Sequence, residues 1–566
     1  MSIRLAADIG GTFTDVVLDK NGLVHSKKLL TTYDDPANAV VSGLDQLMSE
    51  AALDAKDIEI VLHGTTLATN ALIERSGAKT ALLTTEGHRD VLEMAFENRF
   101  EQYDVDIDRR PPLIDRFLRV GVRQRHASDG EEIIPLDQEQ LVSSVRWLSE
   151  QGVASYAVGY LHSYANPSHE IRTLEIIKDL VPEASVSLSS TVCPEIREYE
   201  RLSTTTANAY IKPLMEEYLE SLELQLRSRG VSCPLLLMTS GGGLTTLDTA
   251  KDYPIRLVES GPAGGAILAE QLSKELNEPS LVSFDMGGTT AKICLIDQGS
   301  ANHSRSFEVD RAYRFKKGSG LPLRIPVIEM VEIGAGGGSM ARVDPMKRIQ
   351  VGPQSAGSDP GPVCYGRGGE LSTVSDADAV MGKLYPKFFA GGDLTLDIDA
   401  AKFAIEEQIG TPLGLDVFAG ANSVAEVVDE NMAAAAKAHS SEWGKTMDAR
   451  ALVAFGGAAP LHAANLAKKL KISRLYIPQG AGVGSALGFL LAPARFEVVR
   501  SFFSPLTALN VDAVAKLIYE MRNEATEVVS QISSGPLEEK VRAYIRYQGQ
   551  GHEVSVLIDQ VELVDA

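Results

Sequence analysis

The chain has 566 residues, 44% of them hydrophobic and 23% charged, with a formal net charge of −22. This hydrophobic content excludes disorder for the bulk of the chain, because disordered proteins combine low hydrophobicity with high net charge. The excess of 76 acidic over 54 basic residues disfavours a nucleic-acid-binding surface, which needs clustered Lys and Arg. At roughly 100–200 residues per domain, the length predicts three or four domains or subdomains.

The cysteines and the apolar runs argue against a disulfide-rich, zinc-binding or membrane-spanning protein. The four cysteines are far apart and form no CxxC pair, which argues against a zinc site or a disulfide scaffold. The N-terminus leads into a strand-like segment without a signal-peptide pattern, and no apolar run approaches the roughly 18 residues that cross a membrane. We therefore expect a cytoplasmic protein with no membrane partner.

The first distinctive element is residues 5–19, which read LAADIGGTFTDVVLD. This text predicts a strand ending near Asp8, a tight turn over residues 10–12 and a second strand. Glycine permits positive φ and close approach of the backbone, so successive N–H groups of such a turn can point at one phosphate. Asp15 follows the turn, where it would orient Thr12 or the water on a metal ion; the alternative is an exposed charge beside a turn.

Three further elements precede the middle of the chain. His63 follows an apolar run at an expected strand end, where an imidazole could polarise a carbonyl or move a proton; the alternative is a histidine bonded to a neighbouring loop. Residues 135–151 carry apolar side chains at helical spacing. Ser260 and Pro262 mark the start of a helix of small residues, which permits close packing against another helix.

The first motif is repeated at residues 282–297, which read VSFDMGGTTAKICLID. Asp285 aligns with Asp8, and the same Gly-Gly-Thr turn follows. Two copies of one turn favour duplicated α/β halves that face one another, against the alternative of two unrelated hairpins. Lys292 stands where the first copy has Asp15, and it could face phosphate instead or be an exposed charge beside the turn.

The two hairpins together predict a site for ATP and Mg²⁺. Main-chain N–H groups would supply the donors, which suits a chain that is short of positive charge. Asp8 and Asp285 would supply carboxylates for Mg²⁺, mostly through water, because Mg²⁺ keeps much of its hydration shell. The expected phosphate-binding residues are Gly10, Gly11, Thr12, Gly287, Gly288 and Thr289.

The second half supplies the remaining elements. Residues 332–369, rich in Gly and Pro, predict a rigid loop that lines the cleft or a partner interface. Gly456 and Gly457 follow an apolar strand, where the backbone could lie against an adenine or ribose; the alternative is a tightly packed strand–helix turn. A helix is expected over 421–438 and a second small-residue helix over 484–491.

Several other features stay open. Glu259 and Asp376 are carboxylates beside small-residue turns, with a catalytic or a structural role. Residues 311–324 form a basic island that could meet nucleotide or an acidic partner, or could be a solvated loop. An amphipathic helix over 511–532 and a strand pair over 540–558 are expected near the end of the chain.

The order of these elements resembles the actin, sugar kinase and Hsp70 superfamily, in which two ribonuclease-H-like domains close on ATP and two helices cross at the hinge. The motifs resemble more narrowly the A-type subunit of the hydantoinase/oxoprolinase family, from residue 5 to about residue 553. They are DIGGTFTD at 8–15, HGTT at 63–66, ESGPAGG at 259–265, DMGGTT at 285–290, GAGGGS at 334–339, the segment from GP at 352–353 to GP at 361–362, and TVSDA at 373–377.

The resemblance implies an α/β fold with two duplicated ribonuclease-H-like domains around an ATP cleft. Residues 1–262 would form the first lobe with an inserted α/β region, 263–490 the second lobe, and 491–566 a C-terminal α+β segment. Family chains usually continue past the motif at 547–553, so this chain is either a short member or an incomplete sequence.

The family also implies an activity, because its enzymes use ATP to activate an unreactive carbonyl. The chain would be the ATP-binding subunit of a hydrolase that opens a hydantoin, oxoproline or lactam ring, with Asp8, Asp15, His63 and Asp285 as catalytic residues. A separate B-type subunit, often with a metal, would complete the site in a hetero-oligomer. The alternatives are a subunit of an acetone or acetophenone carboxylase, a non-catalytic ATP-gated binding protein and a simple sugar kinase.

Overall fold

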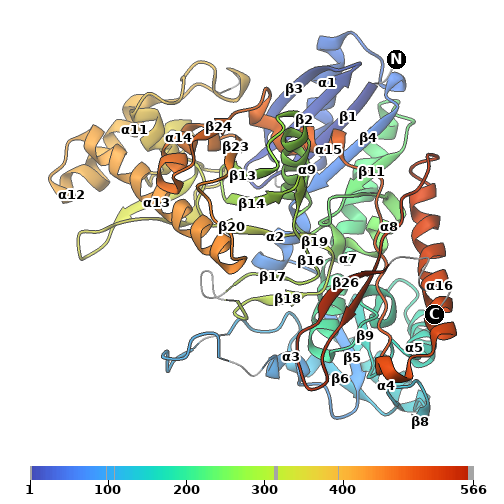
Figure 1. Ribbon diagram of the computed structural model, residues 1–566. Helices are drawn as coiled ribbons and strands as arrows, with labels where there is room; N and C mark the ends of the chain where they lie inside the picture. The colour runs from blue at the N-terminus through green and yellow to red at the C-terminus, as the bar shows by residue number, and fades with distance from the viewer. Residues whose placement is uncertain are drawn as a thin grey trace.

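The computed structural model describes residues 3–32, 34–96, 99–107, 109–311, 317–392 and 394–558. Two lobes and a C-terminal helix with a strand pair follow one another along the chain, and a further α/β region is inserted within the first lobe (Figure 1). Within the described ranges, no helix combines the length and the apolar character that a membrane span requires.

The first lobe is built on a six-stranded sheet with the order β12-β11-β4-β1-β2-β3. Strand β1 pairs antiparallel with β2, whereas β4 and β11 run parallel to β1. Leu5 and Ala7 point into one apolar core and Ala6 into another, so the sheet is buried on both faces, which explains the apolar run in the sequence. The strands are β1 (Ile3–Ile9), β2 (Phe13–Lys20), β3 (Leu23–Leu30), β4 (Ile60–Thr65), β11 (Leu235–Met238) and β12 (Leu244–Thr246).

The second lobe repeats this topology. Its sheet has the order β15-β14-β13-β23-β24, with β20 also paired to β14. Strands β13 and β14 are antiparallel, and β23 and β24 run parallel to β13, as β4 and β11 do to β1. The predicted duplication is therefore present. The strands are β13 (Ser280–Met286), β14 (Ala291–Asp297), β15 (Ser300–Ala301), β20 (Met330–Ile333), β23 (Ala451–Phe455) and β24 (Arg474–Tyr476).

Helices cover the outer faces of both sheets. Helix α1 (Ala37–Ala51) packs on β2 and β3, and α7 (Glu198–Ser228) packs against α1 and α2 (Leu67–Glu74). In the second lobe, the expected helix over 421–438 extends over Val417–Glu442 as α13, because Asp416 caps its start by accepting a hydrogen bond from Ala419 N. The other helices here are α10 (Val374–Val380), α11 (Ile398–Ile405) and α14 (Ala459–Leu470).

Two small-residue helices cross between the lobes, α9 (Ser260–Glu275) and α15 (Gly484–Leu491). A Cβ atom added at Gly488 would collide with the carbonyl oxygen of Gly264, so glycine is required for the two backbones to approach this closely. Their side chains form one core with Ala6 of the first sheet and Val453 of the second. The crossing helices therefore join the inner faces of the two lobes.

The inserted region contains a four-stranded parallel sheet with the order β10-β9-β5-β6, at the opposite end of the molecule from β1 and β3 (Figure 1). The helix expected over 135–151 begins later, as α4 (Gln138–Glu150), because Asp137 accepts a hydrogen bond from Gln140 N and caps it. The other elements are β5 (Thr80–Thr85), β6 (Arg119–Val122), β9 (Ser155–Gly159), β10 (Ser185–Leu188) and α5 (Ser168–Leu180).

The expected division of the chain at 262/263 needs correction. It falls inside α9, and part of the supposed second lobe returns to the first. Strands β17 (Phe307–Val309) and β18 (Leu321–Leu323) pair with each other and pack their apolar side chains into the first-lobe core, beside α7. Their inward apolar side chains fill a surface that the first sheet and α7 leave uncovered, which linear sequence could not show.

The other expected elements have mixed outcomes. The C-terminal helix and strand pair are confirmed as α16 (Val511–Ser530), β25 (Val541–Ile545) and β26 (Val554–Ile558). Within the basic island 311–324, residues 312–316 lie outside the described residues. Arg324 donates from Nε to Glu195 Oε2 at 2.6 Å, so this guanidinium is held by a carboxylate of the first lobe.

Candidate functional site

The two Asp-Gly-Gly-Thr turns have the same geometry and meet between the lobes. Gly10 N donates to Phe13 O at 3.0 Å, and Gly287 N donates to Thr290 O at 3.1 Å. The hydroxyl oxygens of Thr12 and Thr289 are 3.1 Å apart and share a hydrogen bond across the gap. The turns therefore face one another, as the sequence predicted, and they are in direct contact.

The two aspartates lie on either side of the first turns of α9. A Cβ atom added at Gly261 would lie 2.9 Å from Asp8 Oδ1, and one added at Gly265 would lie 3.3 Å from Asp285 Oδ2. Gly261 and Gly265 are four residues apart and therefore lie on one face of α9. Because neither has a side chain, both carboxylates lie directly against the helix backbone on this face. Helix α15 adds Ser485, whose hydroxyl donates to Asp285 Oδ2 at 3.2 Å.

Both carboxylates are poorly compensated by the protein itself. Burial raises the pKa of Asp8 to about 8, with further increases from the charges of Asp15 and Asp285. Burial also raises the pKa of Asp285, to about 6, although Lys292 opposes the increase. Among the described residues, the buried Oδ1 of Asp8 has no hydrogen-bond partner. Such an orphaned oxygen beside a second carboxylate fits a hard cation such as Mg²⁺, which prefers oxygen ligands.

The residues opposite the two aspartates differ. Asp15, the cross-strand partner of Asp8, is paired with Lys28 on β3. Lys292 occupies the equivalent place opposite Asp285, 3.5 Å from Glu259 Oε2 and 3.4 Å from Glu332 Oε1. Burial disfavours the Lys292 charge, but the neighbouring carboxylates outweigh this and raise its pKa above the ordinary value. Neither residue is the exposed turn charge that was the alternative.

Glu259 is a further titratable group beside α9. It immediately precedes this helix with φ +63°, a left-handed conformation that is strained for a residue with a side chain. Burial raises its pKa to about 7, against the lowering effect of Lys292. Asp376 differs, because its carboxylate accepts hydrogen bonds from Thr373 N at 2.8 Å and Cys364 N at 2.7 Å, which is a structural capping role.

The glycine turns of the second lobe surround the second hairpin. Gly456, with φ +97°, lies so close to Asp285 that an added Cβ would collide with Oδ1, and its N–H donates to Ala481 O at 2.7 Å. Among the described residues, nothing lies within 4 Å of a Cβ added at Gly457, so its backbone faces open space. From the loop at 334–338, Gly337 N and Gly338 N donate to the carbonyls of the hairpin, at 3.0 and 2.6 Å. This loop holds the hairpin in place.

His63 does not reach the hairpins, which corrects the expectation of a catalytic histidine. It lies inside β4 opposite Ala7, whereas Asp8 is opposite Gly64, so the two side chains point to opposite faces of the sheet. Its Nδ1 donates to Ala7 O at 3.0 Å, and its Nε2 accepts from the Tyr218 hydroxyl at 2.7 Å. Burial lowers the pKa of His63 to about 4, so it is neutral and structural.

The sequence reasoning missed Ser485, Gly261 and Gly265. The sequence did hold a signal for Ser485. It is a polar residue in the first turn of a helix of small residues, and Ser260 has the same place in α9. The Ser260 hydroxyl donates to Thr65 O at 3.0 Å and accepts from Thr65 N at 3.0 Å, which ties α9 to the end of β4.

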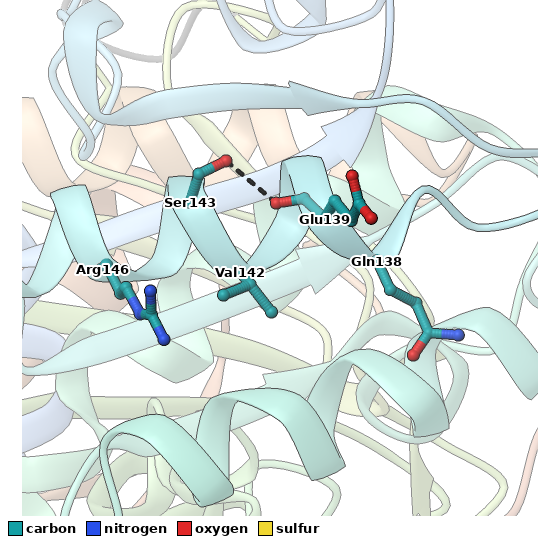
Figure 2. A pocket seen from close by; sticks show the side chains of 5 residues that line it. All are labelled: Gln138, Glu139, Val142, Ser143 and Arg146. Atoms are coloured by element: carbon teal, nitrogen blue, oxygen red, sulfur yellow. Dashed lines mark hydrogen bonds between the residues drawn. The ribbon is translucent and has the colours of Figure 1, made fainter.

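A surface hollow lies elsewhere, on the inserted region. It has a volume of about 350 Å³ and is lined by side chains of the single helix α4 (Figure 2). Figure 2 shows these side chains spread along one helix face, where the Ser143 hydroxyl donates to Glu139 O at 3.0 Å. A depression over one helix, without converging ionisable groups, is not a catalytic site.

Comparisons with known proteins agree with this geometry. Models of the Hydantoinase/oxoprolinase N-terminal region and of Hydantoinase/oxoprolinase match residues 4–181 and 201–498. Caprolactamase subunit alpha from Pseudomonas jessenii is 33% identical over 98% of this chain and 80% of its own length. Acetophenone carboxylase gamma subunit from Aromatoleum aromaticum is 35% identical over 85% of this chain and 66% of its own.

Solved structures extend these likenesses to three dimensions. The crystal structure of the ATP-dependent caprolactamase from Pseudomonas jessenii has a TM-score of 0.83 at 31% identity and covers 99% of this chain and 82% of that chain. The nucleotide-free acetone carboxylase, described for its ATP-dependent acetone carboxylation, has a TM-score of 0.81 at 26% identity, with 98% and 81% covered.

Proposed function

The chain belongs to the hydantoinase/oxoprolinase family, and from that premise we propose that it is the ATP-binding subunit of an enzyme that opens a cyclic amide. In this proposal the enzyme transfers the γ-phosphoryl group of ATP to the carbonyl oxygen of a hydantoin, oxoproline or lactam. The observation that supports it best is the pair of Asp-Gly-Gly-Thr turns that meet between two lobes of equal topology. The ATP dependence of the caprolactamase and of acetone carboxylase agrees with it.

The chemistry explains why ATP is needed. An amide carbonyl is a poor electrophile, because nitrogen donates electron density to it and its oxygen is a poor leaving group. Transfer of a phosphoryl group to that oxygen makes the ring carbon a good electrophile. Water then attacks this carbon, the C–N bond breaks as the nitrogen takes up a proton, and the acyl phosphate that remains is hydrolysed to the ring-opened acid and phosphate. Phosphoryl transfer relies on positioning and on stabilisation of charge, which main-chain donors from two facing turns would supply.

The residues would divide this work between them. The N–H groups of the two glycine pairs and the hydroxyls of Thr12 and Thr289 would donate to phosphate oxygens. Asp8 and Asp285 would hold Mg²⁺, whose charge would return their raised pKa values toward the ordinary range. Gly457 would lie against the nucleoside, and Glu259, with a pKa of about 7, would exchange a proton with the substrate or with water.

ATP cannot enter the site in the conformation described. The 3.1 Å contact between the hydroxyls of Thr12 and Thr289 leaves no space for a phosphate group between them. We infer that the lobes separate at the hairpins when nucleotide binds, with the crossing of α9 and α15 as the pivot. The small residues at that crossing bring the two backbones close together and so give a compact pivot.

A partner subunit is part of the proposal. The relatives are named as subunits of larger enzymes, alpha for caprolactamase and gamma for acetophenone carboxylase. We propose a B-type subunit that completes the substrate site in a hetero-oligomer. We also place the enzyme in the cytoplasm, where ATP is supplied and where the four cysteines, all free in the structure, would stay reduced.

A ketone carboxylase is the second candidate, because acetophenone carboxylase is as similar to this chain as caprolactamase is. Both reactions begin with phosphorylation of a carbonyl oxygen, so the site described here would serve either. The two diverge after that step. In the hydrolase water attacks the carbon of the phosphorylated amide, whereas in the carboxylase the nucleophilic carbon of the phosphorylated enol attacks carbon dioxide derived from bicarbonate.

The test is product analysis with the reconstituted complex. The chain would be co-expressed with a B-type subunit, and ATP hydrolysis measured with hydantoin, 5-oxoproline, caprolactam or a ketone plus bicarbonate. We expect one cyclic amide to stimulate release of ADP and of a ring-opened acid. A bicarbonate-dependent β-keto acid would establish the carboxylase instead. ATP binding without stimulation by any of these compounds would contradict both enzymes.

A further inference from the structure

Four of the chain's ten histidines gather at one end of the inserted sheet. His88, His126 and His162 follow the carboxyl ends of β5, β6 and β9, and His169 lies in the first turn of α5. In open parallel sheets, ligands bind at the carboxyl ends of the strands. This end of the inserted sheet therefore has the position of a binding site, and it is separate from the hairpins of the two lobes (Figure 1).

Three side chains of this region converge. His126 lies on β7 (Arg125–His126) and is the cross-strand partner of Glu132 on β8 (Glu132–Ile134). The His126 ring stacks on that of His169, with centroids 4.0 Å apart. His169 Nε2 is 2.8 Å from Glu132 Oε2. One donor atom from each residue can be chosen so that all three lie within 4.8 Å of one another.

His126 lacks the hydrogen bonds that a buried imidazole needs. The residue is only 1% exposed, and among the described residues neither of its ring nitrogens has a hydrogen-bond partner. Leaving a polar side chain buried and unpaired is unfavourable, because its hydrogen bonds to water are lost without replacement. An electron-pair acceptor between His126 and its neighbours would remove this deficit.

His169 is held in the orientation of a metal ligand. Its Nδ1 is 3.1 Å from the amide oxygen of Gln124, whose amide nitrogen donates to Thr85 Oγ1 at 2.5 Å. The Gln124 oxygen must therefore accept, so His169 carries a proton on Nδ1 and directs Nε2 toward Glu132. Metal-bound histidines usually donate their other ring N–H to an oxygen in this way.

We infer that His126, His169 and Glu132 bind a divalent transition-metal ion, with Zn²⁺ as the best match. Two imidazole nitrogens and one carboxylate oxygen suit Zn²⁺, whereas Mg²⁺ prefers a set of oxygens. The Glu132 side chain is 53% exposed, so an ion can enter from solvent, and three protein ligands leave a coordination position open. The inference does not depend on the proposed ATP chemistry, because no residue of the hairpins takes part.

The experiment is a titration of the metal-stripped full-length chain with Co²⁺, a spectroscopic substitute for Zn²⁺, followed by competition with Zn²⁺. We expect one ion per chain with visible absorption bands typical of four or five ligands that include nitrogen, and we expect Zn²⁺ to displace it. Glu132→Gln, at an exposed position that should not disturb folding, should weaken binding by roughly 10-fold or more. His169→Gln should abolish the bands.

Two controls separate this site from others. His88→Asn changes a histidine at the same end of the sheet but outside the three ligands, and it should leave the titration unchanged. Asp8→Asn alters the hairpin site and should also leave it unchanged. The inference is overturned if Co²⁺ gives only the weak spectrum of the hydrated ion, or if Glu132→Gln and His169→Gln bind it as the unaltered chain does.

Discussion

The two hairpins have one backbone geometry but different charges. Each begins with a strand whose last residue but one is Asp, turns through Gly-Gly-Thr and returns antiparallel. Opposite Asp8 stands another acid, Asp15, whereas opposite Asp285 stands Lys292. Burial raises the pKa of both aspartates. The charge of Asp15 adds to this effect at Asp8, whose pKa reaches about 8, whereas Lys292 opposes it at Asp285, whose pKa reaches about 6. The second hairpin thus places a cation directly opposite its aspartate, whereas the cation of the first hairpin, Lys28, is one strand further away and is paired with Asp15.

The largest effect is expected from removing the carboxylates. Asp8→Asn and Asp285→Asn should each reduce ATP turnover by roughly 100-fold or more, since preorganised charge at the phosphates is lost. Because Asp8 has an acid opposite it where Asp285 has Lys292, Asp8→Asn should also weaken the dependence of turnover on Mg²⁺ concentration more than Asp285→Asn does. Phosphate release measured across a range of Mg²⁺ concentrations checks this. Wild-type turnover in both variants would show that these carboxylates do not organise the metal.

Removing the internal cation should make the second hairpin resemble the first. Lys292 and Glu259 have side chains that are only 14% and 3% exposed, so Lys292→Met should destabilise the protein by about 3 kcal/mol by leaving buried carboxylates unpaired. Lys28→Met is the matched change in the first hairpin. Its more exposed pair with Asp15 should lose only about 1 kcal/mol. Urea unfolding of both variants gives the comparison, and equal losses would contradict the difference drawn between the hairpins.

The pH dependence of stability should follow from the raised pKa values. An Asp in the unfolded chain ionises near 3.8, whereas folded Asp8 keeps its proton up to about pH 8. Unfolding therefore releases a proton between these values, and stability without Mg²⁺ should decrease as pH rises from 4 to 8. Asp285 contributes to the same decrease in stability, but only up to about pH 6, where its folded-state carboxyl ionises.

Thermal unfolding of Asp8→Asn and Asp285→Asn separates the two contributions. The decrease between pH 7 and pH 8 should largely disappear in Asp8→Asn and persist in Asp285→Asn. Below pH 7 the raised pKa of Glu259, about 7, contributes in both variants. Addition of Mg²⁺ to the unaltered chain should also reduce the decrease between pH 7 and pH 8, if the ion binds the ionised carboxylates. A midpoint that is independent of pH over this range in the unaltered chain would refute the assigned titration.

The smallest effect is expected where the hairpins are equivalent. Thr12→Val and Thr289→Val each remove one hydroxyl donor and break the same contact between the lobes. Each should weaken ATP binding by roughly 10-fold, equivalent to a single hydrogen bond to a charged group. Calorimetric titration with a non-hydrolysable ATP analogue would show this, and a large difference between the two variants would mean that the hairpins are not equivalent as phosphate donors.

The sequence predicted those parts of the fold that depend on local chemistry. The two hairpins and the helix over 484–491 were visible because glycine and small residues are required wherever backbones approach closely. Helix boundaries shifted where a capping residue decided them, as Asp137 and Asp416 did. The return of β17 and β18 to the first lobe was not visible, because it depends on contacts between residues far apart in the chain.

The candidate site was predicted in part, for a similar reason. Asp8 and Asp285 stand beside recognisable turns, but the role of Ser485 depends on how α15 packs against the end of β13. His63 was misjudged because the strand continues past it, so its side chain points to the opposite face of the sheet from that of Asp8. The histidine cluster was missed because its members come from two short strands and a helix of the inserted region, which are separated in the sequence.

The central claim is that nucleotide binds between the two hairpins and separates them. The most direct measurement is the rate of disulfide formation in a chain carrying Thr12→Cys together with Thr289→Cys, whose hydroxyls are 3.1 Å apart in the unaltered chain. We predict rapid cross-linking under mild oxidation and strong protection by Mg²⁺ and ATP, in protein shown by calorimetry to bind the nucleotide when reduced. An unchanged rate of cross-linking with nucleotide bound would contradict the claim.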